Sequence, residues 1–305
     1  MSWSPADIPD LSGRTALVTG VSVGGLGYFT ALELARAGGR VVLAGRRPDK
    51  LTESEQAVRA ELPDAALVRL VIDLADLSSV RSAASAAEAF GPLDLLVNNA
   101  GIMATPYHRT VDGFESQLAT NHLGPFLLTG LLLPRLADQA RVVTVSSQMH
   151  RLARKPPLGD PRARPRSYLR WIAYSQTKLA NLLFTFELDR RLRSLGSTVK
   201  AMAAHPGLAG THLVANGRFG RSRGGLSSLV DATARVVSQS PVVGAWPSLM
   251  AATADLPGST YCGPSGLGEA GGPPQLVGWS RQAGDRRAQE RLWELSEAAT
   301  GLSYP

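Results

Sequence analysis

Between residues 14 and 27 the sequence reads Arg14-Thr15-Ala16-Leu17-Val18-Thr19-Gly20-Val21-Ser22-Val23-Gly24-Gly25-Leu26-Gly27, an apolar run that leads into a glycine-rich turn. The run predicts a buried strand over 14–20, and the residues after the turn predict a helix over 25–38. Glycines between a strand and a helix allow the backbone to approach a pyrophosphate and direct helix N–H groups toward it. The stretch therefore predicts a dinucleotide-binding turn; the alternative is a tight turn that needs glycine for steric reasons alone.

The alternation of strand and helix continues along the chain. Helical patterns include one opened by Pro48 at a favoured first-turn position and a long one over 112–137. Buried strands separated by helices predict an α/β fold, a Rossmann-type doubly wound parallel sheet with helices on both faces. A single domain over 1–305 is expected, with an irregular Gly- and Pro-rich connection over 263–278. The further strands are predicted at 41–45, 67–74, 93–97, 141–147 and 198–204.

Composition indicates a soluble, cytoplasmic globular protein without membrane contact. Apolar residues make up 44% and charged residues 19% of the chain, which is ordinary for a soluble globular protein, and no stretch approaches the ~20 apolar residues of a membrane span. The single cysteine, Cys262, excludes an intrachain disulfide framework and suits a reducing compartment. His108, His122 and His212 show no metal-ligand spacing with Cys262, so no metal is predicted.

The net charge of +7 is concentrated in one segment. Residues 151–170 contain seven basic side chains, one acidic side chain and four prolines, which predicts an irregular basic insertion. A nucleic-acid binder would more often carry such charge along a helix with interleaved aromatic residues, so no nucleic-acid partner is expected. The basic residues are Arg151, Arg154, Lys155, Arg162, Arg164, Arg166 and Arg170.

Tyr174 and Lys178 form a candidate acid–base pair. Their spacing of four places them on one face of the helix predicted over 172–193. A nearby cation favours the phenolate, so Lys178 is expected to lower the pKa of Tyr174 from its usual ~10 toward neutrality. Such a tyrosine is a general acid/base for alcohol and carbonyl chemistry. The alternative is two solvated residues on an amphipathic helix.

The tip of the second predicted strand indicates which dinucleotide binds. Arg46-Arg47 follow this strand, and no acidic residue is present there to bind the ribose hydroxyls of NAD. Arginine accommodates a 2′-phosphate, so NADP(H) is favoured over NAD(H). The alternative is that both arginines flank a solvated loop.

The motifs resemble the short-chain dehydrogenase/reductase family, most closely its retinol-dehydrogenase-like branch. The resemblance spans nearly the whole chain, and the order and spacing of the motifs make it specific. They are the glycine-rich turn, Asp73-Leu74, Asn98-Asn99-Ala100-Gly101, Asn121-His122, Ser146-Ser147, Tyr174 to Lys178, His205-Pro206-Gly207 and Thr211.

The resemblance implies four catalytic residues. Tyr174 would exchange a proton with the substrate oxygen, and Ser147 would hydrogen-bond and orient that oxygen. Lys178 would lower the pKa of Tyr174 and bind the nicotinamide ribose, and Asn121 would hold a water molecule that joins Lys178 to solvent. Ser147 is preferred to Ser146 because the family's serine usually follows the small residue that closes the strand; the residues alone allow either.

The resemblance also implies a set of cofactor contacts. Asp73 would lie near the adenine, and Asn99-Ala100-Gly101 would pass behind the adenosine ribose. Pro206-Gly207 and Thr211 would contact the nicotinamide end. The expected cofactor-binding residues are Gly20, Ser22, Gly25, Leu26, Gly27, Arg46, Arg47, Asp73, Leu74, Asn99, Ala100, Gly101, Tyr174, Lys178, Pro206, Gly207 and Thr211.

The chain departs from the family pattern in its glycine spacing. The usual turn is Thr-Gly-x-x-x-Gly-x-Gly; Gly20 and Gly24 fit it but leave Leu26 at the third glycine position. A turn one residue longer uses Gly20, Gly25 and Gly27. The longer register is favoured because the other places a leucine where close helix–strand packing demands glycine.

A second departure is the separation of Ser147 and Tyr174 by 27 positions, longer than the family's commonest arrangement. The additional residues are the basic insertion, 151–170, which must begin and end beside the site. It is either a solvated loop or a positively charged rim that attracts an anionic or carrier-bound substrate. Residues 208–240 are expected to form a substrate-side lobe of the same domain.

These expectations combine into one reaction. We predict reversible hydride transfer between NADP(H) and a carbonyl or secondary alcohol, with Tyr174 as the general acid/base. The partner is a small-molecule substrate, and a homo-oligomer is compatible with the sequence. Two alternatives remain: the same fold acting on a C=N or activated C=C bond, and a nucleotide-binding regulator without turnover. The complete catalytic set argues against the regulator.

Overall fold

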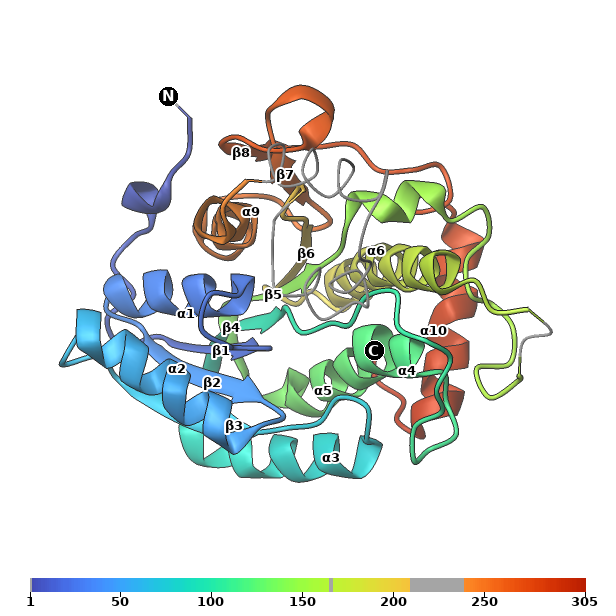
Figure 1. Cartoon of the computed structure of the whole chain (residues 1–305), viewed down its shortest axis with the longest axis horizontal. Helices are drawn as coiled ribbons and strands as arrows, with labels where there is room; N and C mark the ends of the chain where they lie inside the picture. Colours follow the sequence, from blue (N-terminus) through green and yellow to red (C-terminus); the bar gives the residue numbers. More distant parts are fainter. Residues whose placement is uncertain (1, 165–166, 209–238) are drawn as a thin grey trace, which may run out of the picture.

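One eight-stranded sheet organises the computed structural model, which describes residues 2–164, 167–208 and 239–305 (Figure 1). Its strand order is β3-β2-β1-β4-β5-β6-β7-β8, and every neighbouring pair is parallel except β7 and β8. The strands are β1 (Thr15–Thr19), β2 (Arg40–Gly45), β3 (Leu67–Val71), β4 (Leu93–Asn98), β5 (Leu136–Val145), β6 (Lys200–Ala204), β7 (Tyr261–Pro264) and β8 (Pro274–Leu276).

This strand order confirms the predicted doubly wound fold. The chain runs outward from β1 to β3, returns to place β4 on the other side of β1, and continues outward to β7. Leu17 and Val18 of the central strand point to opposite faces and neither is exposed, as expected of a sheet covered on both sides. The order reverses between β1 and β4, and the carboxyl ends of these strands border the crevice in which open α/β sheets bind ligands.

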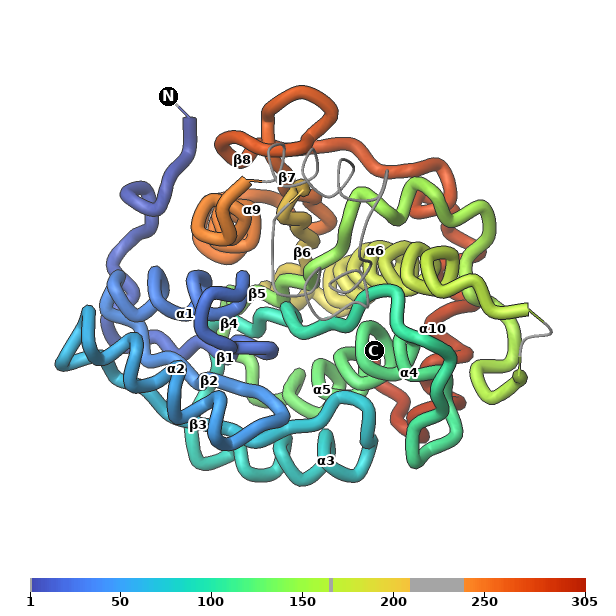
Figure 2. Tube along the Cα trace, viewed as in Figure 1, coloured from blue at the N-terminus to red at the C-terminus, as the bar shows by residue number. Residues whose placement is uncertain are grey.

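Helices cover both faces of the sheet, and the chain trace shows the two layers (Figures 1 and 2). One face carries α1, α2 and α9, and the other carries α3, α5, α6 and α10. A π-helical turn over Ala119–Leu123 joins α4 to α5. The helices are α1 (Leu26–Arg36), α2 (Pro48–Glu61), α3 (Leu77–Ala86), α4 (Ser116–Leu118), α5 (Gly124–Leu132), α6 (Arg170–Ser194), α9 (Pro241–Thr253) and α10 (Arg286–Thr300).

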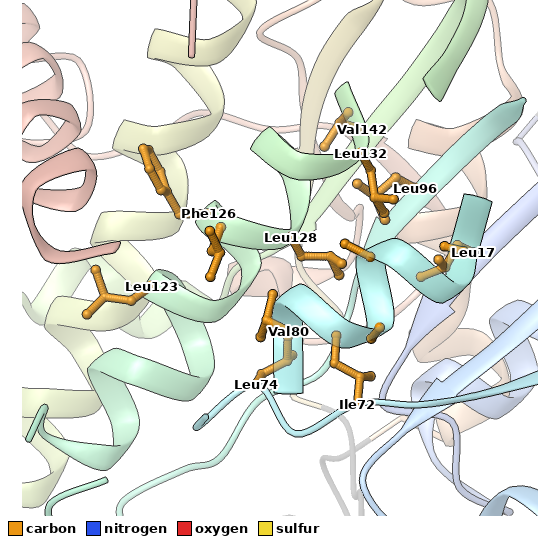
Figure 3. Packing of buried hydrophobic residues seen from close by; sticks show 14 of the residues in the cluster. Leu17, Ile72, Leu74, Val80, Leu96, Leu123, Phe126, Leu128, Leu132 and Val142 are labelled. Atoms are coloured by element: carbon orange, nitrogen blue, oxygen red, sulfur yellow. The ribbon is translucent and has the colours of Figure 1, made fainter. Parts of the chain in front are cut away.

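The larger core cluster lies between the sheet and the α3–α5 layer (Figure 3). Leu17, Leu96 and Val142 extend from β1, β4 and β5, and they cluster with Phe126 and Leu128 of α5. None of these side chains is exposed. Each contributes about 1.5–3 kcal/mol relative to an exposed position, which holds the carboxyl ends of the three strands in fixed relation.

The structure corrects two predicted elements. The helix predicted over 112–137 begins only at Ser116, after Gly113 with its φ of +84°, and Leu136 already belongs to β5. The connection predicted over 263–278 contains the end of β7 and the whole of β8. Pairing with β6 and with each other overrides the weak strand propensity of these Gly- and Pro-rich residues, because strand formation depends on neighbours more than on local preference.

Two further features bear on the site. Most of the predicted substrate-side lobe, 209–238, lies outside the described residues. Within the ranges that are described, no helix is long and apolar enough to cross a bilayer.

Candidate functional site

The glycine-rich turn connects β1 to α1 at the carboxyl edge of the sheet. Gly20 has a left-handed backbone with φ of +75°, and a Cβ there would lie 2.7 Å from the Cα of Ala100. A Cβ on Gly27 would lie 2.5 Å from Asn99 Nδ2 and 2.6 Å from the Gly20 carbonyl oxygen. Leu26 is the first residue of α1. Gly27 is thus the residue at which helix and strand pack closely, in agreement with the longer register.

Two polar side chains lock this turn to the end of β4. The Thr19 hydroxyl accepts hydrogen bonds from the backbone N–H groups of Asn99 and Ala100, both at 3.1 Å. The Asn99 amide nitrogen donates in return to the Thr19 carbonyl oxygen at 2.7 Å. Thr19 was not among the predicted site residues, although its position directly before the first glycine is a signal that could have identified it.

The start of α1 is open to an anion. Its N-cap, Gly25, offers no side-chain hydrogen bond to the first turn, and that turn contains no acidic residue. The first N–H groups of a helix lack intrahelical partners and carry the positive end of the helix dipole. Ser22 is exposed in the same turn, and its carbonyl oxygen accepts from the Gly25 N–H at 2.9 Å. These residues fit the diphosphate of a dinucleotide.

Arg46 and Arg47, which the sequence analysis treated alike, have different partners in the structure. Arg46 Nη1 lies 3.9 Å from Asp73 Oδ2, so Arg46 is beside the residue expected near the adenine. Arg47 instead donates from Nε to Asp49 Oδ1 at 3.1 Å, at the start of α2. The Leu74 side chain belongs to the larger core cluster (Figure 3), which leaves only its backbone for a cofactor contact.

Lys178, Asn121 and Gly101 converge from three separate segments. A Cβ on Gly101 would lie 3.2 Å from Asn121 Oδ1 and 3.5 Å from Lys178 Nζ. Lys178 is 4% exposed, and its ammonium donates to the Val145 carbonyl oxygen at 3.0 Å. The absence of a side chain on Gly101 lets its backbone lie close to Asn121 and to the buried ammonium.

Asn121 holds the backbone of the segment after β4. Its Oδ1 accepts from the Ile102 N–H at 2.8 Å, and its Nδ2 donates to the Ile102 carbonyl oxygen and to Thr177 Oγ1, both at 2.9 Å. The Thr177 hydroxyl, which was not predicted, donates in turn to the Tyr174 carbonyl oxygen at 2.8 Å. Asn121 lies in the π-helical turn, a feature often found at functional sites. Both amide protons are used within the protein, so the predicted contact with water is left to Oδ1 or to the backbone.

The Ser147 side chain interacts with the Tyr174 phenol and lowers its pKa. Tyr174 is 7% exposed on α6, and Ser147 is the N-cap of a 3₁₀ turn over Gln148–Leu152, which we call the serine turn. The Ser146 hydroxyl is buried and donates to the Lys178 carbonyl oxygen at 2.7 Å. The structure therefore distinguishes the two serines that the residues alone left open: Ser147 adjoins the tyrosine, and Ser146 is a satisfied core hydroxyl.

The expected shift of the Tyr174 pKa toward neutrality is wrong for the cofactor-free protein. Burial raises the pKa of Tyr174 to about 12, and the interaction with Ser147 offsets only part of the increase. The Lys178 ammonium is 5.7 Å from the Tyr174 ring centre and donates to Val145, so its charge does not outweigh the desolvation of the phenol. Burial also lowers the pKa of Lys178, to about 8.

Replacing Lys178 by methionine is expected to stabilise the cofactor-free protein. A lysine whose pKa falls from 10.5 to about 8 costs about 3 kcal/mol of stability at neutral pH, and methionine fills a similar volume without charge. The Val145 carbonyl keeps a partner in Asn181 Nδ2, which donates to it at 3.0 Å. We expect urea denaturation at pH 7 to show a gain of about 1–3 kcal/mol.

This gain should depend on pH. The penalty is complete below pH about 8, where Lys178 is charged in both states, and it vanishes as the pH rises toward 10.5, where the unfolded lysine also loses its proton. The advantage of the methionine variant should therefore shrink above pH 8. Lys50→Met, at an exposed lysine of α2, is the control and should change little. A loss of stability in Lys178→Met would show that the buried ammonium is not costly.

Pro206 and Gly207 follow β6 and pack against the connection between β7 and β8. Gly207 has φ of +67°, and a Cβ there would lie 2.6 Å from the Ala270 carbonyl oxygen. Gln239 Nε2 donates to the Pro206 carbonyl oxygen at 2.6 Å. Distant segments therefore set the position of this predicted nicotinamide contact. Thr211 lies outside the described residues.

The basic insertion is anchored on the segment that leads into α4. Arg162 lies over the Phe114 ring at 4.4 Å, and the Tyr168 hydroxyl donates to Glu115 Oε1 at 2.8 Å. A hollow of about 500 Å³ is lined by residues of the insertion, among them Pro157, Tyr168 and Leu169, and by the start of α6. The α6 residues in its wall include Gln176 and also Thr177, which accepts a hydrogen bond from Asn121. The insertion therefore lies against the start of the helix that carries Tyr174.

Two neutral histidines, His150 and His205, hydrogen-bond to backbone groups next to the candidate site. Burial lowers the pKa of His150 to about 4; its Nδ1 donates to the Ser147 carbonyl oxygen at 2.7 Å, and its Nε2 accepts from the Ser280 N–H at 3.2 Å. Burial lowers the pKa of His205 to about 3, and its Nδ1 accepts from the Gly207 N–H at 3.2 Å. Both rings act as hydrogen-bonding spacers and neither titrates near neutral pH.

Several known proteins of similar sequence are named as dehydrogenases. The family model described as short chain dehydrogenase matches residues 14–157. Human retinol dehydrogenase 13 is 38% identical over 314 residues, which span 99% of this chain and 88% of that protein. Mouse polyprenol dehydrogenase is also 38% identical, over 98% of this chain and 87% of that protein.

Solved structures share the fold. The crystal structure of an uncharacterised protein from Mycobacterium paratuberculosis has a TM-score of 0.80 at 44% identity and covers 100% of both chains. That of a dehydrogenase/reductase from Sinorhizobium meliloti 1021 has a TM-score of 0.59 at 26% identity, over 80% of this chain and 89% of that chain. The first likeness includes the part after residue 157, which the family model does not match.

Proposed function

This chain belongs to the short-chain dehydrogenase/reductase family, in its retinol-dehydrogenase-like branch, and we propose that it transfers a hydride between NADP(H) and a carbonyl or secondary alcohol. The observation that supports this proposal most directly is the placement of the Ser147 side chain beside the buried Tyr174 phenol, with the Lys178 ammonium 5.7 Å from the Tyr174 ring centre. This placement brings an oxygen-binding hydroxyl next to a proton donor, on the helix that also carries the buried Lys178. The fit of the glycine-rich turn to a diphosphate supports the cofactor.

In the reducing direction, Tyr174 donates its phenolic proton to the substrate oxygen as negative charge develops there. NADPH, when bound, supplies the hydride. Ser147 donates a second hydrogen bond to the same oxygen and orients it toward the tyrosine. The proton is in place at neutral pH because a pKa of about 12 keeps the phenol protonated. In the oxidising direction, the phenolate accepts the proton of the alcohol.

Lys178 and Asn121 prepare the site for this transfer. The Lys178 ammonium is charged below pH about 8, and its charge stabilises the phenolate that Tyr174 leaves after giving up its proton. Asn121 fixes the backbone next to Gly101, which lies beside the ammonium. We infer that Lys178 and Tyr174 hold the nicotinamide ribose, and that the first turn of α1 holds the diphosphate.

Arg46 is the residue that we expect to select NADP(H). Arg46→Ala should raise KM for NADPH by about 10–100-fold, because a charge-assisted contact with the 2′-phosphate is lost. KM for NADH, which lacks that phosphate, should stay within about threefold. Initial rates measured with each cofactor give the ratio.

Arg47→Ala is the matched control for this substitution. It removes the adjacent arginine, which pairs with Asp49 in the structure, and should affect both cofactors little. Equal effects of Arg46→Ala on NADPH and NADH would argue that Arg46 is only a surface residue that does not select the 2′-phosphate.

A substrate panel separates the proposed function from its alternatives. Carbonyl, imine and enone compounds are offered with NADPH, and oxidation of NADPH is followed by absorbance. Turnover of ketones or aldehydes above the other classes supports the proposal. Preference for imines or enones would keep the enzyme class but change the bond that is reduced. Binding of NADPH without turnover of any class would indicate a nucleotide-binding regulator.

The start of the basic insertion is proposed to attract anionic substrates. Arg154 and Lys155 are exposed there, whereas Arg151 pairs with Glu269. Reversing both exposed charges to glutamate should raise KM for a carboxylate-bearing substrate about tenfold at low salt and less at high salt. If KM and its salt dependence do not change, the insertion is a solvated loop.

A further inference from the structure

Glu269 lies between β7 and β8 in an unfavourable backbone conformation. Its φ is +56°, in the left-handed region that favours glycine, and the preceding Gly268 has φ of +60°. A non-glycine residue persists in this region when its surroundings over-determine its position. Contacts of the side chain and of the neighbouring backbone provide that constraint.

The Glu269 carboxylate contacts three residues from two other segments. Oε1 accepts from Arg151 Nη2 at 3.2 Å, and Oε2 accepts from Gln148 Nε2 at 3.3 Å. Oε2 is also 3.0 Å from His205 Nε2, although the two are not aligned as a hydrogen bond. The Glu269 side chain is 23% exposed, so these interactions are partly shielded from solvent and salt.

These contacts join the two segments that flank the proposed reaction centre. Gln148 and Arg151 belong to the serine turn, which begins directly after Ser147. His205 begins the segment that is expected to contact the nicotinamide. Its neutral ring carries the proton on Nε2, toward Glu269, because Nδ1 accepts a backbone hydrogen bond. The Glu269 carboxylate therefore contacts both the serine turn and the segment after β6.

The backbone around Glu269 contacts the same two segments. The Gly268 carbonyl oxygen accepts from Gln148 Nε2, and the Ala270 carbonyl oxygen accepts from the Leu208 N–H at 2.9 Å. The connection between β7 and β8 thus bridges the serine turn and the residues after β6 by neutral hydrogen bonds. The carboxylate adds a charged contact to this bridge, which strengthens it.

We propose that Glu269 is a positioning residue that holds the serine turn and the segment after β6 in register across the site. This inference rests on the proposed function, which assigns to Ser147 the orientation of the substrate oxygen. Glu269 acts through Gln148, Arg151 and His205 rather than by contact with the substrate. Without its carboxylate the serine turn loosens, and the Ser147 hydroxyl is less often aligned when the hydride is transferred.

Two substitutions separate this role from a contribution to stability. Glu269→Gln keeps the size of the side chain and the strained backbone but removes the charge. Glu269→Gly removes the side chain and relaxes the backbone at φ of +56°, so this variant has a reason to fold. Glu294→Gln is the matched control, because Glu294 is exposed on α10 and pairs there with Arg291.

We expect both Glu269 variants to lower kcat about tenfold while KM for NADPH stays within about threefold of wild type. The primary isotope effect from NADPH deuterated at the transferred hydrogen should increase, because misalignment makes hydride transfer more rate-limiting. A mere loss of folded protein lowers the measured rate but leaves the isotope effect unchanged. The Glu294→Gln control should match wild type in all three measurements.

Hydrogen exchange gives a readout that does not depend on turnover. Amides of 148–152 and of His205, Gly207 and Leu208 should exchange about tenfold faster in both Glu269 variants than in wild type or in Glu294→Gln. An unchanged isotope effect or unchanged exchange in these segments overturns the positioning role, whatever happens to kcat. A wild-type protein without turnover on the substrate panel refutes the proposed function instead, and the exchange measurement then still decides whether Glu269 fixes the two segments.

Discussion

Turnover is expected to fall by about 10²–10⁴-fold when Tyr174 is replaced by phenylalanine. The substitution removes the phenolic proton that the proposed mechanism transfers, and it leaves the ring packed on α6. NADPH binding should stay within about threefold of wild type, because the contacts of the diphosphate and of Lys178 remain. Steady-state kinetics give the first quantity, and a titration of nicotinamide fluorescence gives the second.

Tyr304→Phe controls for the loss of a buried tyrosine hydroxyl. Tyr304 is buried against α5, and its hydroxyl donates to the Phe126 carbonyl oxygen at 3.0 Å. Its loss should cost about 0.5–1.5 kcal/mol of stability without lowering kcat. Substantial activity in Tyr174→Phe would mean that another group donates the proton, and the assignment of the general acid would be refuted.

The second large effect is expected at the glycine-rich turn. Gly20→Ala would place a methyl group 2.7 Å from the Ala100 Cα, on a backbone with φ of +75°. The methyl group would collide with main-chain atoms, which no side-chain rotation can relieve. We expect a loss of about 2–5 kcal/mol in the free energy of unfolding, from strain and overpacking together. NADPH binding should weaken at least about tenfold, because the turn that holds the diphosphate must shift.

Gly13→Ala is the matched control, because its φ is +78° but no heavy atom lies within 4 Å of the added Cβ. It imposes the backbone strain without the collision and should cost about 1–2 kcal/mol without affecting NADPH binding. Urea denaturation of both variants measures the difference. Equal losses would show that the approach of Gly20 to Ala100 contributes nothing to stability.

Much of the fold could be predicted because its strands are buried on both faces. An apolar run such as 14–20 fits few structures other than a buried strand. Pro48 begins α2 at a position where a missing backbone N–H costs nothing. The prediction failed at β7 and β8, because their glycine and proline residues have weak strand propensity and these short strands form only by pairing with neighbouring strands. It also misplaced the start of the helix after residue 112, which Gly113 and its left-handed backbone postpone to Ser116.

The candidate site also has parts that could be predicted from the sequence and parts that could not. Tyr174 and Lys178 share a helix by their spacing, and the glycine-rich turn follows from local pattern alone. The choice of Ser147 over Ser146 depends on how β5 packs against α6, because one hydroxyl meets the tyrosine and the other meets a helix carbonyl. The different partners of Arg46 and Arg47 likewise depend on the neighbouring strand end.

The sequence by itself therefore determined the order of strands and helices as far as β6, the glycine-rich turn and the spacing of the candidate acid–base pair, because these follow from periodicity and from the steric demands of glycine. Only the tertiary structure decided the pKa of Tyr174, since desolvation by surrounding segments outweighs the cation four residues away. Only the tertiary structure brought Glu269 to Gln148, 121 positions earlier, because contacts between distant segments leave no periodic trace in the chain.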